Sequence, residues 1–600
     1  MAEKQILTGS DIIVKVLAEQ GVETIFGYSG GAILPTYDAV FQYNEIHKDN
    51  PIPLIVPANE QGAGFMASGY ARATGKPGIV LVTSGPGATN TVTPVRDAMA
   101  DSIPMIVICG QVNRSSIGSD AFQEAPITSV MGSVAKHVFL VTKEEKLAAT
   151  LRAAFEISTS GRPGPVVVDV PKDVQTASIE FEINSTLNIN AYRDRLKTIE
   201  NNRLSDQQCE SFYNYLRASN RPLIYSGGGT IAAEASKELR SFSDRFQIPV
   251  TTTLMGIGAV DTQSQLSLQM LGMHGTAFAN YAVEDCDFII AMGSRFDDRV
   301  AALPKQFAPK AKAVAHFDID ASEIDKVKQT DWSHVGLLKT ALNDLMAYAD
   351  KNNIKDVFSD WANEIQELKS TYPLDYDRTS DLIQPQMVLD EINHLTKGNA
   401  IVSTGVGQHQ MWSAQYFDFK EPRQWLTSGS MGTMGFGLPA AIGAQFAHPD
   451  KLVIDVDGDG SIRMNLGDLE TVTTYDLPIK ILLLNNAGDG MVKQWQKLYY
   501  GGRLSASDKT LYKKDFVLSA QSDGFEYAER LTDKTQIQKT IKEFIGCKKA
   551  AFLEVIIDPD AMVFPMVGPG MSYSQMITGE HIKSRNEDPE VEPIDPKAMF

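Results

Sequence analysis

Cysteine, histidine and long hydrophobic runs are scarce or absent in this 600-residue sequence. The four cysteines, Cys109, Cys209, Cys286 and Cys547, are widely spaced and form no CxxC motif, so we expect neither a disulfide framework nor a zinc site. The nine histidines show no paired spacing, which argues against a histidine-rich metal centre. No apolar run reaches the length of about 18 residues that crosses a bilayer, so no membrane span is expected.

Net positive charge is also lacking. Lys and Arg number 55 against 74 Asp and Glu, which gives a formal charge of −19 with His neutral. A chain this acidic repels a phosphate backbone, and no local basic patch offsets the repulsion, so nucleic acid is not an expected partner. The first residues show neither a signal-peptide core nor the Arg and Ser richness of a transit peptide, so we expect a cytoplasmic protein.

What is present is the composition of a large globular protein. Apolar residues make up 43% and charged residues 22% of the chain, which argues against general disorder. At about 150–200 residues per domain, the length predicts three or four domains.

Short apolar runs alternate with longer amphipathic runs in three successive stretches, a pattern typical of parallel α/β units. We expect an α/β fold with three doubly wound parallel-sheet domains at 1–180, 200–350 and 380–575, followed by a tail at 576–600. Residues 176–202 and the part after a charged helix within 350–382 are predicted linkers. The charged, proline-containing segment from Glu580 onward is either disordered or an ordered arm. The expected buried strands are Leu54–Pro57, Gly78–Ser84, Met105–Gly110, Pro165–Val170, Arg221–Ser226, Pro249–Leu254, Asp287–Gly293, Lys312–Ile319, Ala400–Thr404, Lys451–Asp457, Ile479–Asn485 and Ala551–Ile557.

The most specific local pattern lies in the third stretch, where two expected strands end in polar residues. One runs into Gly458-Asp459-Gly460-Ser461, and the next ends at Asn485-Asn486. In an open parallel sheet both ends reach the edge where ligands bind. A carboxylate and an amide oxygen suit Mg²⁺, and the glycines let backbone N–H groups approach a diphosphate. Gly-Asp-Gly alone would indicate a surface turn, whereas the pair of strand ends predicts a metal-diphosphate site.

The first stretch contributes a carboxylate at an expected strand-to-helix turn, in Pro57-Ala-Asn-Glu60-Gln61-Gly62. Taken alone, Glu60 is as well explained by the helix dipole, which favours an acid in the first turn. Together with the metal-diphosphate pattern, it resembles the ring-activating carboxylate of thiamine-diphosphate enzymes, which is hydrogen-bonded to the aminopyrimidine ring in a water-poor site that strengthens the contact.

These two patterns resemble the cofactor motifs of thiamine-diphosphate enzymes. The likeness becomes more specific in further segments, which resemble the large catalytic subunit of acetohydroxyacid synthase from about residue 6 to about residue 575. Those segments are FGYSGGAILP at 26–35, TSGPGATN at 83–90, DAFQE at 120–124, LGMHG at 271–275, RFDDR at 295–299, GVGQHQMW at 405–412 and GMVKQW at 490–495.

The resemblance implies a reaction and a set of cofactors. Pyruvate is decarboxylated on thiamine diphosphate, and the hydroxyethyl carbanion condenses with pyruvate or 2-ketobutyrate to give 2-acetolactate or 2-aceto-2-hydroxybutyrate, in branched-chain amino-acid biosynthesis. Mg²⁺ and FAD are the other implied cofactors, with FAD structural. The alternative is another enzyme on the same scaffold, such as pyruvate oxidase, sulfoacetaldehyde acetyltransferase or an acyl-CoA decarboxylase, or a non-enzymatic homologue.

Site residues follow from the same resemblance. Glu60 activates the ring, Met434 props the bent cofactor, Gln123 lies near the reacting centre, and Arg299 holds the carboxylate of the second ketoacid. The implied metal ligands are Asp459, Asn486 and the Gly488 carbonyl. Further thiamine-diphosphate contacts are Val406, Gln408, His409, Gly432, Gly460, Ser461 and Met491, and the substrate pocket adds Gly31, Phe122 and Trp495.

The middle stretch resembles the FAD-binding domain of the family. Its glycine-rich turn at 227–229 is not GxGxxG, so a simple tight turn is an equal reading. The implied FAD contacts are Gly228, Gly229, Thr253, Leu254, Met255, Met273, His274, Arg295 and Asp318.

Assembly is also implied. In the superfamily the Glu60 domain of one subunit faces the diphosphate domain of another, so a homodimer or homotetramer is expected, with a small regulatory subunit as a possible partner.

The sequence departs from the family pattern at two places. Arg463 stands where an apolar residue is usual, and Ala487 to Gly490 are smaller than is usual after Asn-Asn.

Overall fold

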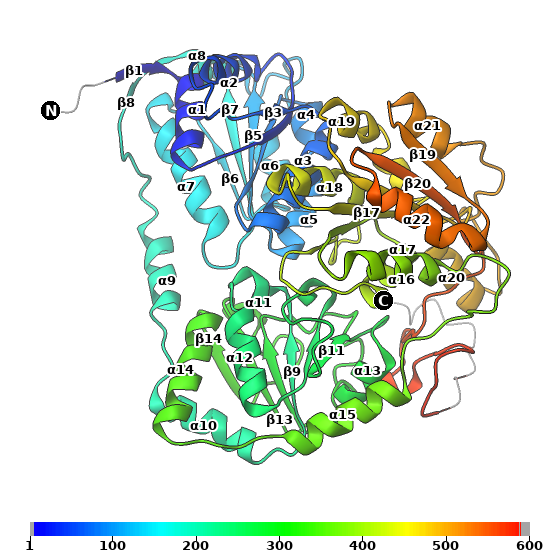
Figure 1. The fold of residues 1–600 in the computed structure, drawn as a ribbon. Coiled ribbons are helices and arrows are strands. Elements are labelled where there is room, and N and C mark those ends of the chain that lie inside the picture. The colour runs from blue at the N-terminus through cyan, green and yellow to red at the C-terminus, as the bar shows by residue number, and fades with distance from the viewer. Residues whose placement is uncertain (1–4, 587–588, 590–600) are drawn as a thin grey trace. The chain divides into compact units, whose positions relative to one another are not determined.

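The computed structural model of the chain describes residues 5–586 and residue 589. Its internal contacts divide the chain into two compact units, the first made of residues 1–196, 428–453 and 464–479, and the second of residues 197–427, 454–463 and 480–600. Three six-stranded sheets are present in the described part (Figure 1).

The first sheet has the order β3-β2-β4-β5-β7-β6, and all its pairs are parallel. Val166, Val167 and Val168 on β7 are all fully buried, as expected for a strand covered on both faces. The strands are β2 (Ile25–Tyr28), β3 (Leu54–Ile55), β4 (Gly78–Val82), β5 (Met105–Gln111), β6 (His137–Leu140) and β7 (Pro165–Pro171), and the helices between them are α1 (Gly9–Glu19), α2 (Leu34–Ile46), α3 (Glu60–Thr74), α4 (Pro86–Thr89), α5 (Val92–Asp101), α6 (Ile127–Gly132), α7 (Leu147–Thr159) and α8 (Lys172–Thr176).

The central sheet, in the second unit, has the order β11-β10-β9-β12-β13-β14. Its strands are β9 (Pro222–Ser226), β10 (Val250–Thr252), β11 (Ser267–Met270), β12 (Phe288–Met292), β13 (Ala313–Asp318) and β14 (Trp332–Val335). The helices are α10 (Asp206–Arg217), α11 (Gly228–Ala232), α12 (Ser236–Phe246), α13 (Ala277–Asp285), α14 (Leu338–Lys351) and α15 (Ser359–Thr371).

The third sheet has the order β16-β15-β17-β18-β20-β19. Its strands are β15 (Ile401–Thr404), β16 (Trp425–Leu426), β17 (Val453–Gly458), β18 (Lys480–Asn485), β19 (Tyr527–Leu531) and β20 (Ala551–Ile556). The helices of this part of the chain are α16 (Pro385–Thr396), α17 (Gln408–Tyr416), α18 (Gly437–Ala447), α19 (Asp468–Thr474), α20 (Gly490–Tyr499), α21 (Phe516–Ser522) and α22 (Ile537–Gly546).

Each sheet reverses its strand order next to its first strand along the chain, and these reversals locate the ligand edges. Numbered within its own sheet, the first and third sheets share the order 2-1-3-4-6-5, whereas the central sheet has 3-2-1-4-5-6, the order of dinucleotide-binding folds. The reversals fall between β2 and β4, between β9 and β12, and between β15 and β17. Open α/β sheets bind ligands at the carboxyl ends of such strand pairs.

Helices α3 and α18, both in the first unit, cross at glycines (Figure 1). A Cβ on Gly69 would lie 2.1 Å from the Ala440 carbonyl oxygen, and one on Gly443 would lie 1.9 Å from the Met66 carbonyl oxygen. Only residues without a side chain permit this backbone approach. Helix α3 is capped at its start by Asn59, whose side chain accepts from the Gly62 N–H, and at its end by the left-handed Gly75, as capping rules predict.

The twelve predicted strands are confirmed within two residues at their ends, and a helix followed by an irregular segment is present within 350–382. The prediction of an irregular linker at 176–202 was wrong in part. Strand β8 (Ser178–Phe181) pairs antiparallel with β1 (Gln5–Thr8), and α9 (Asn190–Glu200) follows. The stretch is polar, but Ile179 and Phe181 alternate inward and are each 5% exposed, which is enough to hold a short edge strand.

The tail is ordered in its described part. Arg585 forms an ion pair with Asp285 at 2.6 Å and lies 4.4 Å from the ring centroid of Tyr281, both on α13. Residues 587–588 and 590–600 lie outside the described residues. The domain limits assigned above stay predictions.

Two predictions, that the chain has no disulfide framework and no membrane span, concern the cysteines and the helices of the described residues. All four cysteines are free thiols, and three of them are buried. Among helices of the described part, none has the length and apolar character needed to cross a bilayer.

Candidate active site

Two strand ends of the third sheet bring Asp459 and Asn486 together. Strands β17 and β18 are parallel neighbours with Gly458 opposite Leu484, so the residues that follow them leave the same edge. The Asn486 backbone lies close enough to the Asp459 carboxylate to lower the pKa of that group. Both residues are buried, and Gly460 and Ser461 continue the first of the two turns.

The Asp459 carboxylate fits a cation. Its Oδ1 is buried and accepts no hydrogen bond from any described residue. Burial raises the pKa of Asp459 to about 6, against the lowering effect of the Lys509 ammonium. An isolated buried carboxylate oxygen is costly, and a divalent cation removes that cost.

The donor set is that of Mg²⁺ rather than of zinc. Among described residues no group of three or more His, Cys, Asp or Glu side chains could hold a metal. A cation beside Asp459 would depend on one carboxylate, the Asn486 amide, a backbone carbonyl and ligand phosphates. Mg²⁺ accepts that mixture.

A chain of amide side chains sets the orientation of Asn486. Gln494 Oε1 accepts from the Val563 N–H at 2.8 Å and from Gln408 Nε2 at 2.9 Å. Gln408 Oε1 in turn accepts from Asn486 Nδ2 at 3.1 Å. Because the amide nitrogen of Asn486 is engaged, its Oδ1 is the atom left for a cation. Gln408 therefore orients Asn486, and Gln494, which sequence reasoning missed, orients Gln408.

The loop after β15 meets the loop after β17 at the strand-order reversal of this sheet. The Val406 N–H donates to Ser461 Oγ at 3.2 Å. A Cβ on Gly458 would lie 2.6 Å from His409 Nδ1, so the imidazole packs directly on the backbone. Burial lowers the pKa of His409 to about 3, and the ring is therefore neutral near pH 7.

The turn after β18 contains Gly488, which forms a bridge with Asp508, and leads into α20. Ala487 is left-handed with φ 53°, and the Lys509 N–H donates to the Ala487 carbonyl at 2.9 Å. Lys509 also pairs with Asp489. Met491 and Trp495 follow on α20 and are half-buried, with the Trp495 ring 5.3 Å from that of Tyr499.

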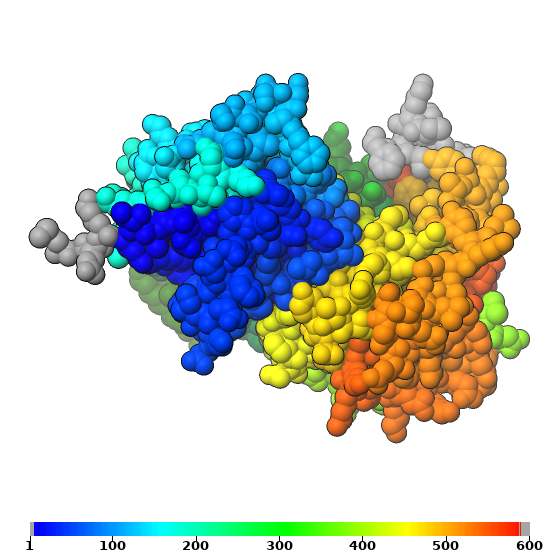
Figure 2. All heavy atoms as spheres, turned by 90° about the horizontal axis from the view of Figure 1, so that it is seen from above, coloured from blue at the N-terminus to red at the C-terminus, as the bar shows by residue number. Residues whose placement is uncertain are grey.

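The segment 500–514, which follows α20, is largely exposed and lies in the orange part of the surface (Figure 2). Leu511 is 90% exposed. The guanidinium of Arg463 lies 4.5 Å from the centroid of the Tyr512 ring. This cation–π contact explains a charged residue at a position where an apolar one was expected.

In the first unit, Glu60 begins α3 directly after β3. Its Oε2 accepts from Asn90 Nδ2 at 2.8 Å, and a Cβ on Gly87 would lie 3.3 Å from its Oε1. Asn90 was missed as an orienting residue, although it ends the motif at 83–90. The signal available was its position one turn after Gly85-Pro86-Gly87.

Gln123 lies beside the same glycine turn. It is left-handed with φ 58°, and a Cβ on Gly85 would lie 2.7 Å from its carbonyl oxygen. Phe122 is 88% exposed in this chain. Gly31 has open space around it, and its pocket role, like that of Phe122, stays a prediction.

The predicted FAD contacts gather at the carboxyl edge of the central sheet. A Cβ on Gly229 would lie 2.7 Å from Gly293 Cα, so these glycines let the turns after β9 and β12 touch at the strand-order reversal. The Thr253 side chain accepts from the Gly256 N–H at 3.0 Å. The other candidates at this edge are Gly228 at the start of α11, Leu254 and Met255 after β10, Arg295 after β12 and Asp318 at the end of β13.

Met273, His274 and Arg299 lie in one neighbourhood. The Met273 N–H donates to the Arg299 carbonyl at 2.8 Å, and both residues line a pocket with Val567 and Tyr573 of the C-terminal segment. His274 Nδ1 is 3.3 Å from the Pro565 carbonyl oxygen. The Arg299 side chain is exposed, so it is available to a ligand carboxylate.

The fold and these strand-end sites agree with three family matches. The thiamine pyrophosphate enzyme N-terminal TPP binding domain matches residues 7–131, the central domain matches residues 210–345, and the C-terminal TPP binding domain matches residues 405–555. The chain is therefore a thiamine pyrophosphate enzyme.

Similarity to curated proteins shows which family of thiamine pyrophosphate enzymes the chain belongs to. Acetolactate synthase 1, chloroplastic, of Nicotiana tabacum is 42% identical over 95% of this chain and 85% of its own length. The mitochondrial acetolactate synthase catalytic subunit of Saccharomyces cerevisiae is 43% identical over 98% of this chain and 85% of its own, and chloroplastic acetolactate synthase of Arabidopsis thaliana is 42% identical over 95% and 84%. The chain belongs to the acetolactate synthase family.

Proposed function

We propose that the chain is an acetolactate synthase that decarboxylates pyruvate and joins the remaining two-carbon unit to a second 2-ketoacid. The observation that carries the proposal is the unpartnered, buried Asp459 Oδ1 beside Asn486 at the reversal edge of the third sheet. Thiamine pyrophosphate supplies the electron sink for the bond that breaks next to the pyruvate carbonyl.

The protein's own residues would bind the metal and the cofactor and would orient the second ketoacid. Asp459, the Asn486 Oδ1 and the Gly488 carbonyl would hold Mg²⁺ against the diphosphate, while Gly460, Ser461 and His409 line the turns that approach it. Asn90 leaves Glu60 Oε1 free to hold a proton shared with the aminopyrimidine ring. Met434 would support the thiamine rings, and the planar guanidinium of Arg299 would bind the carboxylate of the second ketoacid through two hydrogen bonds.

FAD is proposed for the central sheet. Its strand order is that of dinucleotide-binding folds, and its reversal lies where Gly227 to Gly229 meet Gly293. Arg295 and Asp318 leave the same edge and supply polar partners. A structural role is favoured because no redox change is needed in the proposed reaction.

Assembly and location are also proposals. We infer a homodimer or homotetramer and a separate regulatory subunit, since relatives in yeast and Aspergillus candidus are named catalytic subunits. The cytoplasm stays a prediction, because the relatives' names place them in chloroplasts and mitochondria.

Product analysis tests the function directly. Purified protein with pyruvate, with and without 2-ketobutyrate, should form 2-acetolactate and 2-aceto-2-hydroxybutyrate under nitrogen. Omission of thiamine pyrophosphate or Mg²⁺ should abolish turnover. An absolute need for oxygen would instead indicate a pyruvate oxidase, and unchanged turnover in Glu60→Gln would refute the role of that carboxylate.

A further inference from the structure

A buried ion-pair cluster joins α3 and α5 in the first unit. Arg72 Nη2 lies 2.9 Å from Oδ2 of both Asp97 and Asp101, and Arg72 Nε donates to Ser68 Oγ at 3.2 Å. The side chains of both aspartates are 0% exposed and that of Arg72 is 4% exposed. One cation thus faces two carboxylates away from water, and further donors are needed to balance them.

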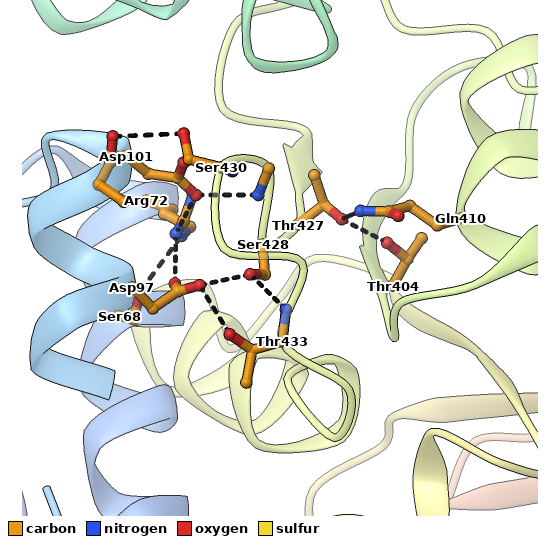
Figure 3. Close-up of polar contacts among 12 residues, drawn as sticks. Ser68, Arg72, Asp97, Asp101, Thr404, Gln410, Thr427, Ser428, Ser430 and Thr433 are labelled. Carbon is orange, nitrogen blue, oxygen red and sulfur yellow. Dashed lines mark hydrogen bonds and ion pairs between the residues drawn. The ribbon is translucent and has the colours of Figure 1, made fainter. Parts of the chain in front are cut away.

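Those donors come from the loop at 428–435 (Figure 3). Asp97 Oδ1 accepts from Ser428 Oγ and, at 3.2 Å, from Thr433 Oγ1. Asp101 accepts from the backbone N–H groups of Gly429 and Ser430 at 3.0 and 2.9 Å. If the loop moved away, these buried carboxylates would lose four donors, so the cluster and the loop conformation depend on each other.

The contacts fix the chain on both sides of Met434. Before it, Ser428 Oγ accepts from the Thr433 N–H at 2.9 Å and closes the loop. After it, the Arg72 guanidinium lies 5.0 Å from the centroid of the Phe436 ring. The Gly435 carbonyl accepts from Asn465 Nδ2 at 2.8 Å. Met434 is therefore a half-buried residue in a loop that is held on both sides of it.

We propose that Arg72, Asp97 and Asp101 are positioning residues that hold Met434 in place to support the thiamine rings. The inference rests on the role proposed for Met434. A support that is fixed before the cofactor arrives needs no ordering during the reaction. The cluster itself touches neither cofactor nor substrate in this account and acts only through the loop.

Asp97→Asn is the first test, because it keeps the size of the side chain and removes the charge that the loop donors meet. We expect kcat to fall by about 10- to 100-fold, as for a catalytic group displaced by about 1 Å, with the KM for pyruvate within about twofold of wild type. Glu156→Gln is the matched control. It breaks the ion pair between Glu156 and Arg193 at 2.7 Å in the same unit, away from the loop, and should leave kcat unchanged.

A double-mutant cycle separates positioning from general stability. Met434→Ala should lower kcat, and adding Asp97→Asn to it should lower kcat by no more than about a further twofold, because the support is already absent. Full additivity of the two losses would overturn the inference. If Met434→Ala alone kept wild-type kcat, the role of Met434 would fail, and the inference with it. If Met434→Ala lowered kcat but Asp97→Asn did not, the role of Met434 would be supported and the positioning role of the cluster would be refuted.

Hydrogen exchange of the protein without cofactor gives a readout that is independent of activity. In Asp97→Asn the amides at 428–433 should exchange faster, while those of β5 and β7 should not change. Unchanged exchange at 428–433 would contradict the proposal. If Asp97→Asn does not fold, Thr433→Val removes one donor to Asp97 and serves in the same cycle.

Discussion

At the scale of single residues, the candidate active site depends on groups whose hydrogen-bonding capacity is only partly used. Asp459 keeps one carboxylate oxygen without a donor among described residues, and Asn486 keeps its amide oxygen because its nitrogen is engaged by Gln408. Polar groups left in this state cost free energy when buried. Their conjunction at one sheet edge therefore indicates a ligand, whereas a fully paired Asp459 would have indicated a structural turn.

Gln494→Leu tests the chain of amides that orients Asn486. The change leaves the Val563 N–H and one bond of Gln408 unpaired, so the Asn486 amide can turn. We expect the Mg²⁺ concentration for half-maximal binding of thiamine pyrophosphate to rise by about 10- to 100-fold, as when a residue behind a metal ligand is removed. Fluorescence titration would measure it. Lys497→Gln, on the same helix but paired with the exposed Asp560, is the control, and equal Mg²⁺ demand in both variants would contradict the model of oriented amides.

His274 should make stability depend on pH. Burial lowers its pKa to about 4, with Arg299 contributing and the Pro565 carbonyl opposing. Since the unfolded state binds a proton near pH 6.5 and the folded state does not, this stabilisation is complete above pH 6.5 and is lost as pH falls toward 4. The loss is about 2 kcal/mol at pH 5. Urea unfolding at pH 8 and pH 5 would measure the free energy of unfolding of the wild type and of His274→Gln. Between these pH values the wild type should lose about 2 kcal/mol more than the variant. Equal losses would refute the prediction.

At the scale of elements, backbone contact through glycine locks α3 to α18. The two carbonyl contacts at Gly69 and Gly443 leave no space for a methyl group. Phe65 and Phe436 extend the contact, with ring centroids 5.5 Å apart. Since α3 begins at Glu60 and α18 follows the Met434 loop, this crossing sets both candidate residues within the first unit.

Gly443→Ala should therefore destabilise the protein. The added Cβ meets a backbone oxygen that cannot move independently of its helix, and we expect a loss of about 1–3 kcal/mol, as for overpacking in a core. Calorimetry would show a lower thermal midpoint. Gly132→Ala, at the end of α6 with nothing within 4 Å of an added Cβ, is the matched control and should change stability by about 1 kcal/mol or less. Equal thermal midpoints for the two variants would mean that α3 and α18 can move apart with no loss of stability.

The helices and strands also show which parts of the fold could be predicted from the sequence. Buried strands were predictable because an uninterrupted apolar run such as that of β18 needs cover on both faces. The Asp459 and Asn486 turns were predictable for the same reason, since parallel strands must end at one edge. The pairing of β8 with β1 and the contact of Asn90 with Glu60 were not, because each depends on tertiary placement of a polar segment that has no strong local pattern.

At the scale of the whole molecule, one topological rule is used three times. Each sheet reverses its strand order next to its first strand, and the candidate residues lie at those reversals or beside them: Glu60 and Gln123 in the first sheet, Gly229 in the central sheet, and Asp459 in the third. The first and third sheets share a strand order, whereas the central one has the dinucleotide-binding order. This difference favours the division proposed above, with FAD at the central sheet and thiamine pyrophosphate at the other two.

Mixing two inactive variants tests how the proposed active site is assembled. We expect Glu60→Gln and Asp459→Asn each to be inactive alone. If Glu60 of one chain acts on the cofactor held by Asp459 of a second chain, a mixed dimer contains one intact site and one doubly altered site. Equal amounts, randomly associated, should then recover about a quarter of wild-type activity, since half of the dimers are mixed and each has one of two sites intact. Subunits exchanged at low protein concentration and assayed for acetolactate would report it, with sedimentation to verify dimers. A site completed within one chain would leave every site in the mixture with one altered residue, so exchanged dimers without activity would refute the shared arrangement.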